Sequence, residues 1–244
     1  MGETVTARAL AVLAAFSAEH PELTLTDIGR RAGLPLTTVH RLAGELTAWG
    51  ALERVDGRYR IGLRLWEVGS LAPRGLGLRE SAMPFLEDLY EVTKQNVQLA
   101  VLDGTEVVYL ERISGRNAVS VVTRVGGRLP LHATGVGRVL LAHADPAFQE
   151  EVLGRPLRRF TPRTVTSPDE LRRILAEVRL TGVAVSDRQI ELVSLSIAAP
   201  VRGPRGDVVA ALSIVVPAES DTRAYVPVVR AAARGISRTL GAPG

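Results

Sequence analysis

Apolar residues in the first part of the chain recur with helical spacing and are separated by short polar breaks. Over Thr6–Ala18 they return about every three residues, which predicts a helix. A shorter helix is expected over Leu25–Ala32, because Thr24 and Asp27 have the spacing of a capping box at its start. Gly33 follows directly, and a glycine at this place is typical of a helix end.

A third helix is expected to begin at Leu34-Pro35, because proline is tolerated in a first helical turn, and to run to Trp49. Its apolar stripe consists of Val39, Leu42, Ala43 and Leu46. The opposite face is small and polar with a single arginine, and it carries Thr37, His40, Arg41, Gly44 and Ala48. A helix with such a face can lie close to another surface.

The next segment has the pattern of a β-hairpin. Asp56-Gly57 lies between two runs of β-forming residues, which is a strong hairpin signal. In the return strand Arg58 and Arg60 project from one face and Tyr59 from the other. Helices followed by a basic hairpin in this order indicate a winged helix-turn-helix. In this fold the second helix of the helix-turn-helix motif enters the DNA major groove.

A further helix, Leu63–Ala72, is followed by a break at Pro73–Gly77. We therefore expect residues 1–62 to form one domain, residues 63–77 a linker helix and hinge, and residues 78–244 a second domain. Trp66 on the linker helix is interpreted as a core residue or a dimer contact.

The second domain alternates between hairpin strands and helices. Leu78–Lys94 is strongly periodic, and its apolar face is expected to be Leu78, Ala82, Phe85, Leu86, Leu89 and Val92. The other expected helices are Gly135–Ala144, Pro168–Leu180 and Ala224–Leu240. The expected strands are Val97–Leu102, Val107–Ile113, Ala118–Arg124, Val183–Ser186, Leu192–Pro200 and Val208–Val216. This order predicts an α+β domain on a largely antiparallel sheet.

Composition excludes several classes of protein. Hydrophobic residues make up 46% of the 244 positions and charged residues 23%, which excludes a wholly disordered chain. No apolar run approaches the ~18 residues of a membrane helix, so we expect a cytoplasmic protein without a membrane partner. There is no cysteine, and the four histidines are far apart in the sequence. We therefore expect no metal site and no cofactor.

The charge distribution agrees with a DNA-binding first domain. Seven arginines and three acids lie between Ile28 and Arg64. Arginine is suited to bidentate contacts with phosphate and guanine. The dominance of arginine over the single lysine, Lys94, has a second explanation in a GC-rich coding sequence.

From about Thr6 to about Gly241 the sequence resembles the IclR family of bacterial transcriptional regulators. The resemblance is carried by Ala32–Leu42, Gly57–Leu65, Arg128–Arg138 and Ala198–Arg202, the last followed by Val209–Ser213. It implies an N-terminal winged helix-turn-helix, a linker helix and a C-terminal GAF-like domain that binds a small organic effector. It also implies a homodimer or dimer of dimers on a double-stranded DNA operator with inverted-repeat half-sites.

The resemblance and the helix pattern together identify candidate DNA-binding residues. They are Thr37, Thr38, His40 and Arg41 on the third helix, and Arg54, Arg58 and Arg60 on the hairpin. Arg41 can pair with guanine O6 and N7, which contributes about 1–3 kcal/mol of discrimination. The hairpin arginines would contact phosphate or the minor groove. The family often has a polar Lys-Ser-Thr where this chain has Leu36-Thr37-Thr38, so a phosphate contact is lost at Leu36.

Candidate effector-binding residues lie in the second domain. In the family the loop at Thr134-Gly135-Val136 lines the effector pocket, and a helix start can hold a carboxylate through its free N–H groups. The same Gly-x-Gly spacing also serves in a simple tight turn. The further candidates are Asp187, Ser194, Ser196 and Ser213. The family commonly has a cysteine at Ser196, so we expect a pocket of altered chemistry that takes a small, carboxylate-bearing metabolite.

Three alternatives follow from the sequence. An enzyme is not favoured, because motifs of hydrolases, zinc proteases and nucleotide-binding loops are missing and His132 is the sole acid–base candidate near the pocket. We expect no catalytic residues. A sequence-blind DNA architectural protein is disfavoured, since the first 73 residues hold eight arginines and eight acids. A small-molecule-binding module without site-specific DNA binding stays open.

Overall fold

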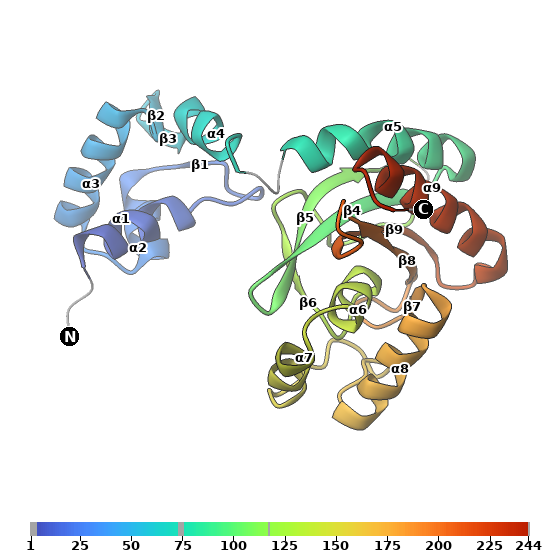
Figure 1. The fold of residues 1–244 in the computed structure, drawn as a ribbon. Coiled ribbons are helices and arrows are strands. Elements are labelled where there is room, and N and C mark those ends of the chain that lie inside the picture. Colours follow the sequence, from blue (N-terminus) through green and yellow to red (C-terminus); the bar gives the residue numbers. More distant parts are fainter. Residues whose placement is uncertain (1–3, 73–75, 117, 244) are drawn as a thin grey trace. The chain divides into compact units, whose positions relative to one another are not determined.

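The computed structural model describes residues 4–72, 76–116 and 118–243. The chain divides into two structural units, Met1–Pro73 and Arg74–Gly244 (Figure 1). The helix predicted as a linker falls in the first unit, and part of the expected break at Pro73–Gly77 lies outside the described residues. Each unit has its own hydrophobic core.

The first unit is a winged helix-turn-helix. Its elements are α1 (Val5–Ala14), β1 (Glu22–Leu23), α2 (Leu25–Ala32), α3 (Leu36–Trp49), β2 (Leu52–Val55), β3 (Arg58–Ile61) and α4 (Leu63–Gly69). The predicted capping box of α2 is confirmed: Thr24 Oγ1 accepts a hydrogen bond from the Asp27 N–H, and the Asp27 carboxylate accepts one from the Thr24 N–H. Gly33 ends the helix with φ 67°, a left-handed conformation that favours glycine.

Two helix boundaries in this unit differ from the prediction. Pro35 is extended and precedes α3, so its expected place inside the first helical turn is wrong. The α region is also disfavoured for the residue before a proline, which leaves Leu34 outside the helix. α1 ends at Ala14 rather than Ala18, because the backbones of Ser17 and His20 pair with each other and turn the chain.

The hairpin of β2 and β3 forms the predicted wing. Asp56 and Gly57 both have positive φ, 49° and 79°, which matches the tight two-residue turn expected there. β3 lies between β1 and β2 in an antiparallel sheet. Tyr59 is buried, and Arg58 and Arg60 are exposed, so the predicted alternation along the return strand is confirmed.

The second unit is built on an antiparallel sheet, as predicted. Its helices are α5 (Leu76–Thr93), α6 (Gly135–Ala142), α7 (Pro146–Leu153), α8 (Pro168–Thr181) and α9 (Thr222–Thr239). Its strands are β4 (Asn96–Asp103), β5 (Glu106–Ile113), β6 (Arg128–Pro130), β7 (Ala184–Asp187), β8 (Ser194–Arg202) and β9 (Val208–Pro217). They follow the order β6-β5-β4-β9-β8-β7 across a six-stranded sheet.

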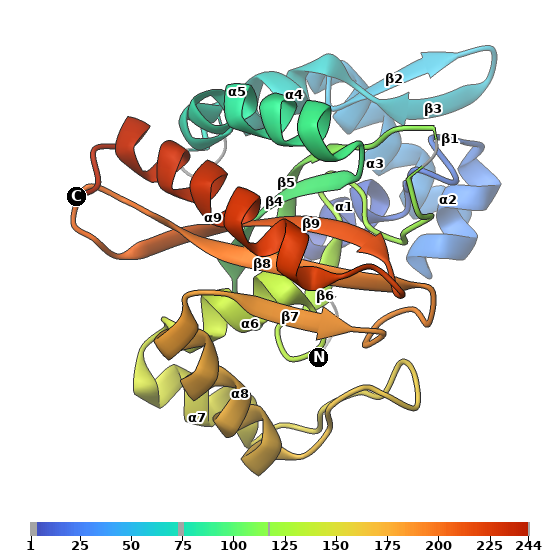
Figure 2. The same cartoon turned by 90° about the vertical axis from the view of Figure 1, so that its right-hand side faces the viewer.

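The two faces of this sheet are covered by different helices (Figure 2). Leu99, Ile197 and Leu212 point to one face, where they join the core formed with α5 and α9. Their neighbours Ala100 and Ala198 point to the other face, toward α6 and α8, since side chains alternate along a strand. We call these the α9 face and the α6 face.

Three predictions for this unit are corrected. Residues 118–124 form no strand, and β6 takes the place beside β5. Side chains of β4 hold that segment instead: Asn96 Nδ2 donates to the Val119 carbonyl, and Gln98 Nε2 donates to Thr123 Oγ1. Val92 is 73% exposed and does not belong to the apolar face of α5. α7 was not predicted.

Candidate functional site

The exposed face of α3 is the first candidate site. Val39, Leu42 and Ala43 are buried in the core of the first unit, so the predicted apolar stripe is confirmed. The opposite face is open, and its two nitrogen-bearing side chains, His40 and Arg41, are both exposed. Thr37 is exposed and Thr38 half-buried, while Leu36 leaves an apolar group exposed in the first turn. The helix therefore exposes small and hydrogen-bonding side chains on one face, while its opposite, apolar face is packed in the core.

Intramolecular contacts hold several of the basic side chains beside this face. Arg41 donates to Glu45 at 2.6 Å, one helical turn away on α3. On the wing Arg60 pairs with Glu53 at 2.8 Å across the strands, and the Arg54 guanidinium lies over the Tyr59 ring at 5.6 Å. All of these charges are exposed, so they contribute little to folding and remain available to an anionic partner.

The second candidate is a cavity at one end of the α6 face. Along β4, β8 and β9 this face changes within two residues from apolar to polar: Ala100, Ala198 and Ala211 are followed by Gln98, Ser196 and Ser213. The cavity lies at the polar end, with an empty volume of about 390 Å³ including its open mouth. The polar side chains that line it are Gln98, Tyr109, Thr123, Thr134, Ser186, Gln189, Glu191, Ser194 and Ser196.

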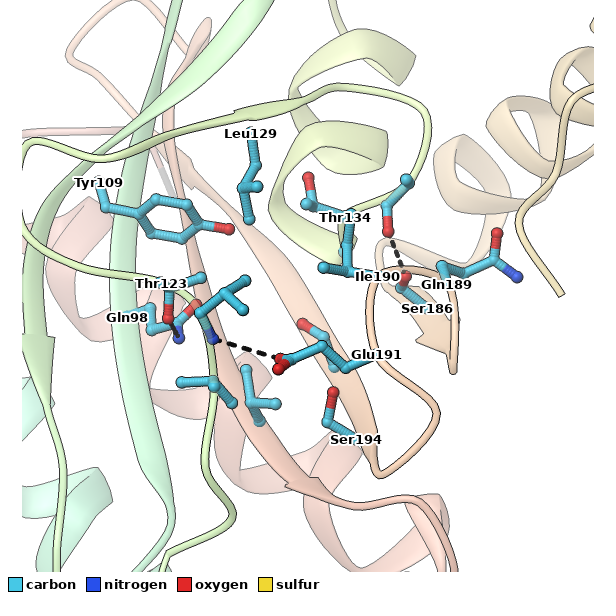
Figure 3. Close-up of a pocket in the computed structure, with 16 residues that line it drawn as sticks. Gln98, Tyr109, Thr123, Leu129, Thr134, Ser186, Gln189, Ile190, Glu191 and Ser194 are labelled. Atoms are coloured by element: carbon cyan, nitrogen blue, oxygen red, sulfur yellow. Dashed lines mark hydrogen bonds between the residues drawn. The ribbon is translucent and has the colours of Figure 1, made fainter. Parts of the chain in front are cut away.

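Several hydroxyl groups in the cavity are available to a ligand (Figure 3). Tyr109 comes from β5 with its hydroxyl directed into the cavity, and burial raises the pKa of that phenol, so it is neutral. In the described structure the side-chain oxygens of Tyr109, Ser194 and Ser196 make no hydrogen bond with the protein. Glu191 forms part of the rim, where its carboxylate accepts a hydrogen bond from the Val122 N–H at 3.3 Å.

The start of α6 packs directly on the sheet beside the cavity. A Cβ on Gly135 would lie 2.7 Å from Ser196 Oγ, so glycine is required by close approach. The Thr134 hydroxyl caps the helix by accepting from the Gly137 N–H, and it donates to the Pro130 carbonyl. Thr134 therefore contributes through its position in the wall rather than through a free hydroxyl.

A buried cation lies behind this wall. Arg138 is 3% exposed and donates to three acceptors, the His132 carbonyl (2.8 Å), the Val185 carbonyl (3.0 Å) and Gln189 Oε1 (2.7 Å). Burial lowers its pKa to about 10, which still leaves it charged near neutral pH. Among the described residues no carboxylate is bonded to it. Since Gln189 links Arg138 to the cavity lining, the charge favours an anion there.

The structure separates the predicted effector residues into two groups. Thr134, Gly135, Ser194 and Ser196 line the cavity. Val136 is in the core, and Asp187 forms ion pairs with Arg163 and Arg188 outside the lining. Ser213 is fully buried and adjoins Gln98 on β4, and its Oγ has no partner in the described structure.

Other cavity residues were not singled out from the sequence. Gln98 interrupts an otherwise apolar strand, and this polar residue was a usable signal. Tyr109, Ser186 and Glu191 reach the cavity through strand register and loop placement. His132, the acid–base candidate, does not line the cavity, and its Nε2 lies 2.9 Å from the Arg158 carbonyl. Burial also lowers the pKa of His132, so the ring is neutral.

The described residues include neither a metal-binding cluster nor a membrane-spanning helix. No group of three or more histidine, aspartate or glutamate side chains in that part of the chain could hold a metal ion. None of its helices is long and apolar enough to cross a membrane.

Two family models match the chain. The model for the IclR helix-turn-helix domain matches residues 5–56, and the model described as bacterial transcriptional regulator IclR C-terminal matches residues 72–238. Together they cover both structural units.

Several known proteins are similar to this chain over most of both sequences. The HTH-type transcriptional regulator XynR of Escherichia coli (strain K12) is 36% identical over 210 residues, which cover 85% of this chain and 83% of that protein. The Pca regulon regulatory protein of Pseudomonas putida is 32% identical over 245 residues, covering 97% and 84%. The crystal structure of an IclR homolog complexed with 4-hydroxybenzoate from Microbacterium hydrocarbonoxydans is similar with a TM-score of 0.93 and 44% identity, covering 97% of this chain and 99% of that one.

Proposed function

This chain belongs to the IclR family of bacterial transcriptional regulators, and we propose that it binds an inverted-repeat operator as a homodimer or dimer of dimers. The observation that carries the proposal is the exposed polar face of α3 over its buried stripe of Val39, Leu42 and Ala43. A helix of this kind, beside a basic wing, has the shape and chemistry for the major groove.

The residues divide into two roles in this proposal. Those of α3 read base edges, and they are Thr37, Thr38, His40 and Arg41. Those of the wing bind phosphate or the minor groove and supply affinity more than sequence preference, and they are Arg54, Arg58 and Arg60. Leu36, 54% exposed in the first turn, would meet a thymine methyl group rather than a phosphate.

An apolar surface on α4 supports self-association. Leu63 and Trp66 lie one turn apart on the same side of this helix and are 64% and 66% exposed. Trp66 is therefore not a core residue, and the alternative interpretation as a dimer contact is the one we propose. Burial of such side chains against a second copy would stabilise the dimer by about 25 cal/mol for each Å² of apolar surface removed from water.

Selection of genomic fragments by the purified protein tests the operator. We expect an inverted repeat to be recovered, because two copies of the chain present two copies of α3. Its affinity, measured by fluorescence anisotropy at two salt concentrations, should exceed that of random duplex by about 10³-fold or more at the higher salt. Equal, strongly salt-dependent binding of all fragments would contradict site-specific recognition.

For the effector we propose a small aromatic carboxylate. The carboxylate would lie at the start of α6, where the N–H groups of Gly135 and Val136 are in the first turn and the charge of Arg138 is close behind. The opposite end of the ligand would meet Glu191 and Ser194, which suits a hydroxyl donor. The related structure that holds 4-hydroxybenzoate supports this ligand class.

The proposed regulation is allosteric. Effector binding in the second unit would change operator affinity by a coupling free energy of about 1–3 kcal/mol. By linkage, operator DNA must then change effector affinity by the same factor.

Replacing Tyr109 with phenylalanine should weaken binding of 4-hydroxybenzoate about 5- to 10-fold, because a single hydrogen bond to the ligand is lost and ring packing is kept. Isothermal titration calorimetry measures the change. Tyr225→Phe on α9, at the other face of the sheet, is the matched control and should bind as the wild type does. Equal affinities of the two variants, or no binding to the wild type, would contradict the proposed ligand and its place.

A further inference from the structure

A groove rich in arginine lies in the second unit, away from the effector cavity. It is formed by the C-terminal half of α9, the end of β8 and the turn after α8, elements that Figure 2 shows close to the C-terminus. Its empty volume is about 1,260 Å³ including the open side, and it shares no residue with the cavity. Its basic residues are Arg202, Arg230, Arg234 and Arg238, and none of the described residues that line it is acidic. We call it the arginine groove.

The arginines are aligned by the helix itself. Arg230, Arg234 and Arg238 are four residues apart, which places them on one face of α9 at a rise of about 6 Å each. Residues 222–239 include four arginines and no acid. Like charges at this spacing repel one another, which opposes the favourable position of Arg238 in the last turn of the helix.

The four arginines of the groove differ in their hydrogen-bond partners among the described residues. Arg202 donates to the Gly206 carbonyl at 2.8 Å, and Arg230 donates to the Thr181 carbonyl. The guanidinium groups of Arg234 and Arg238 are exposed and make no hydrogen bond or ion pair with any described residue. Arg172, another exposed arginine of this unit, instead bonds to both Glu150 and Asp169.

The surroundings of the groove are also positive. Burial lowers the pKa of His143, and the charges of Arg202 and Arg179 lower it further, against a hydrogen bond to Val139 that raises it. His143 is thus kept neutral beside two guanidinium groups.

The floor and the end wall give the groove its concave shape. Ala199, Pro200 and Ala233 provide an apolar floor. At the end of α9 Gly241 has φ 84°, a left-handed conformation that favours glycine. There the Gly241 N–H bonds to the Arg238 carbonyl and the Ala242 N–H to the Ser237 carbonyl. These bonds satisfy carbonyls that would repel an anion, and they fold Ala242 and Pro243 over the end of the groove.

We propose that the arginine groove binds a small phosphorylated metabolite with at least two phosphate groups, held by Arg234 and Arg238. Guanidinium groups bind phosphate in bidentate fashion, and their spacing along α9 suits neighbouring phosphates. The apolar floor would receive the uncharged part of the ligand. The concave shape, with Ala242 and Pro243 at one end, favours a small molecule over the backbone of a DNA duplex.

Equilibrium binding of pyrophosphate and of ATP, each in EDTA at fixed ionic strength, tests the proposal. The full-length double variant Arg234→Gln/Arg238→Gln should bind both probes at least about tenfold more weakly than the wild type. The control Arg173→Gln/Arg223→Gln removes two exposed arginines outside the groove and should bind as the wild type does. Unchanged thermal melting will show that both variants fold.

Three outcomes would overturn the proposal. They are no binding of either probe to the wild type, an equal loss in the two double variants, and a loss of random-sequence duplex binding in Arg234→Gln/Arg238→Gln with pyrophosphate binding intact. The third would identify the groove as a contact for the DNA backbone. Binding of 4-hydroxybenzoate should not change in either variant, which separates this test from that of the effector cavity.

Discussion

Replacing Arg41 with alanine is expected to weaken binding to the selected operator by about 5- to 150-fold, which corresponds to the 1–3 kcal/mol of a bidentate guanine contact. Arg41 is exposed on the polar face of α3, and Glu45 holds it at 2.6 Å in the free protein. This ion pair orders the guanidinium before DNA binds. On binding, the contact with Glu45 must be replaced by the contact with guanine. Fluorescence anisotropy on operator and scrambled duplexes at one salt concentration measures the effect.

Arg58→Ala on the wing is the informative comparison. Because a phosphate contact does not depend on sequence, Arg58→Ala should weaken both duplexes by similar factors and reduce the salt dependence. Arg41→Ala should instead lower the ratio of operator to scrambled affinity. If Arg41→Ala left both affinities unchanged, α3 would not read DNA, and the chain would act as a small-molecule-binding module.

The second large effect is expected for the stability of the effector unit. Arg138→Ala would leave three buried acceptors unpaired, the carbonyls of His132 and Val185 and Oε1 of Gln189. Each unpaired buried group costs about 1–3 kcal/mol, so the free energy of unfolding of this unit should fall by about 3 kcal/mol or more. Arg172→Ala, which breaks only exposed ion pairs, should lower it by less than about 1 kcal/mol.

The two tryptophans allow the units to be followed separately. Trp49 and Trp66 both belong to the first unit, so their fluorescence during urea titration reports on that unit. Far-UV circular dichroism reports on both units. Arg138→Ala should lower the urea midpoint of the dichroism signal and leave the fluorescence midpoint in place. A shift of both midpoints by the same amount would show that the units unfold together, and no shift would show that Arg138 is not structural.

Local signals predicted the first unit well. The capping box at Thr24, the turn at Asp56-Gly57 and the stripe of α3 depend on residues close in sequence, and the structure has all of them. The strand expected over Ala118–Arg124 failed for a reason that is not local. Its apolar residues look like a strand, but Asn96 and Gln98 bind this segment and the edge of β5 pairs with β6.

The effector cavity could be predicted only in part for the same reason. The loop at Thr134 and the serines of β8 were visible as polar or glycine-containing breaks in apolar runs. Tyr109 and Glu191 give no such signal, because their place depends on how β5 is aligned with β4 and where the loop after β7 lies. Register decides which polar residues converge, and it is a property of the whole sheet.

The change from apolar to polar positions along the α6 face has a practical consequence for altering ligand preference. Ala100, Ala198 and Ala211 hold the helices on the sheet, while Gln98, Ser194 and Ser196 lie further along the strands at the cavity. Ser194 can be randomised in a mutant library without removing side chains from the apolar core or the bond between Gln98 and Thr123. A reporter gene placed behind the operator would then turn such a library into a search for biosensors of new aromatic acids.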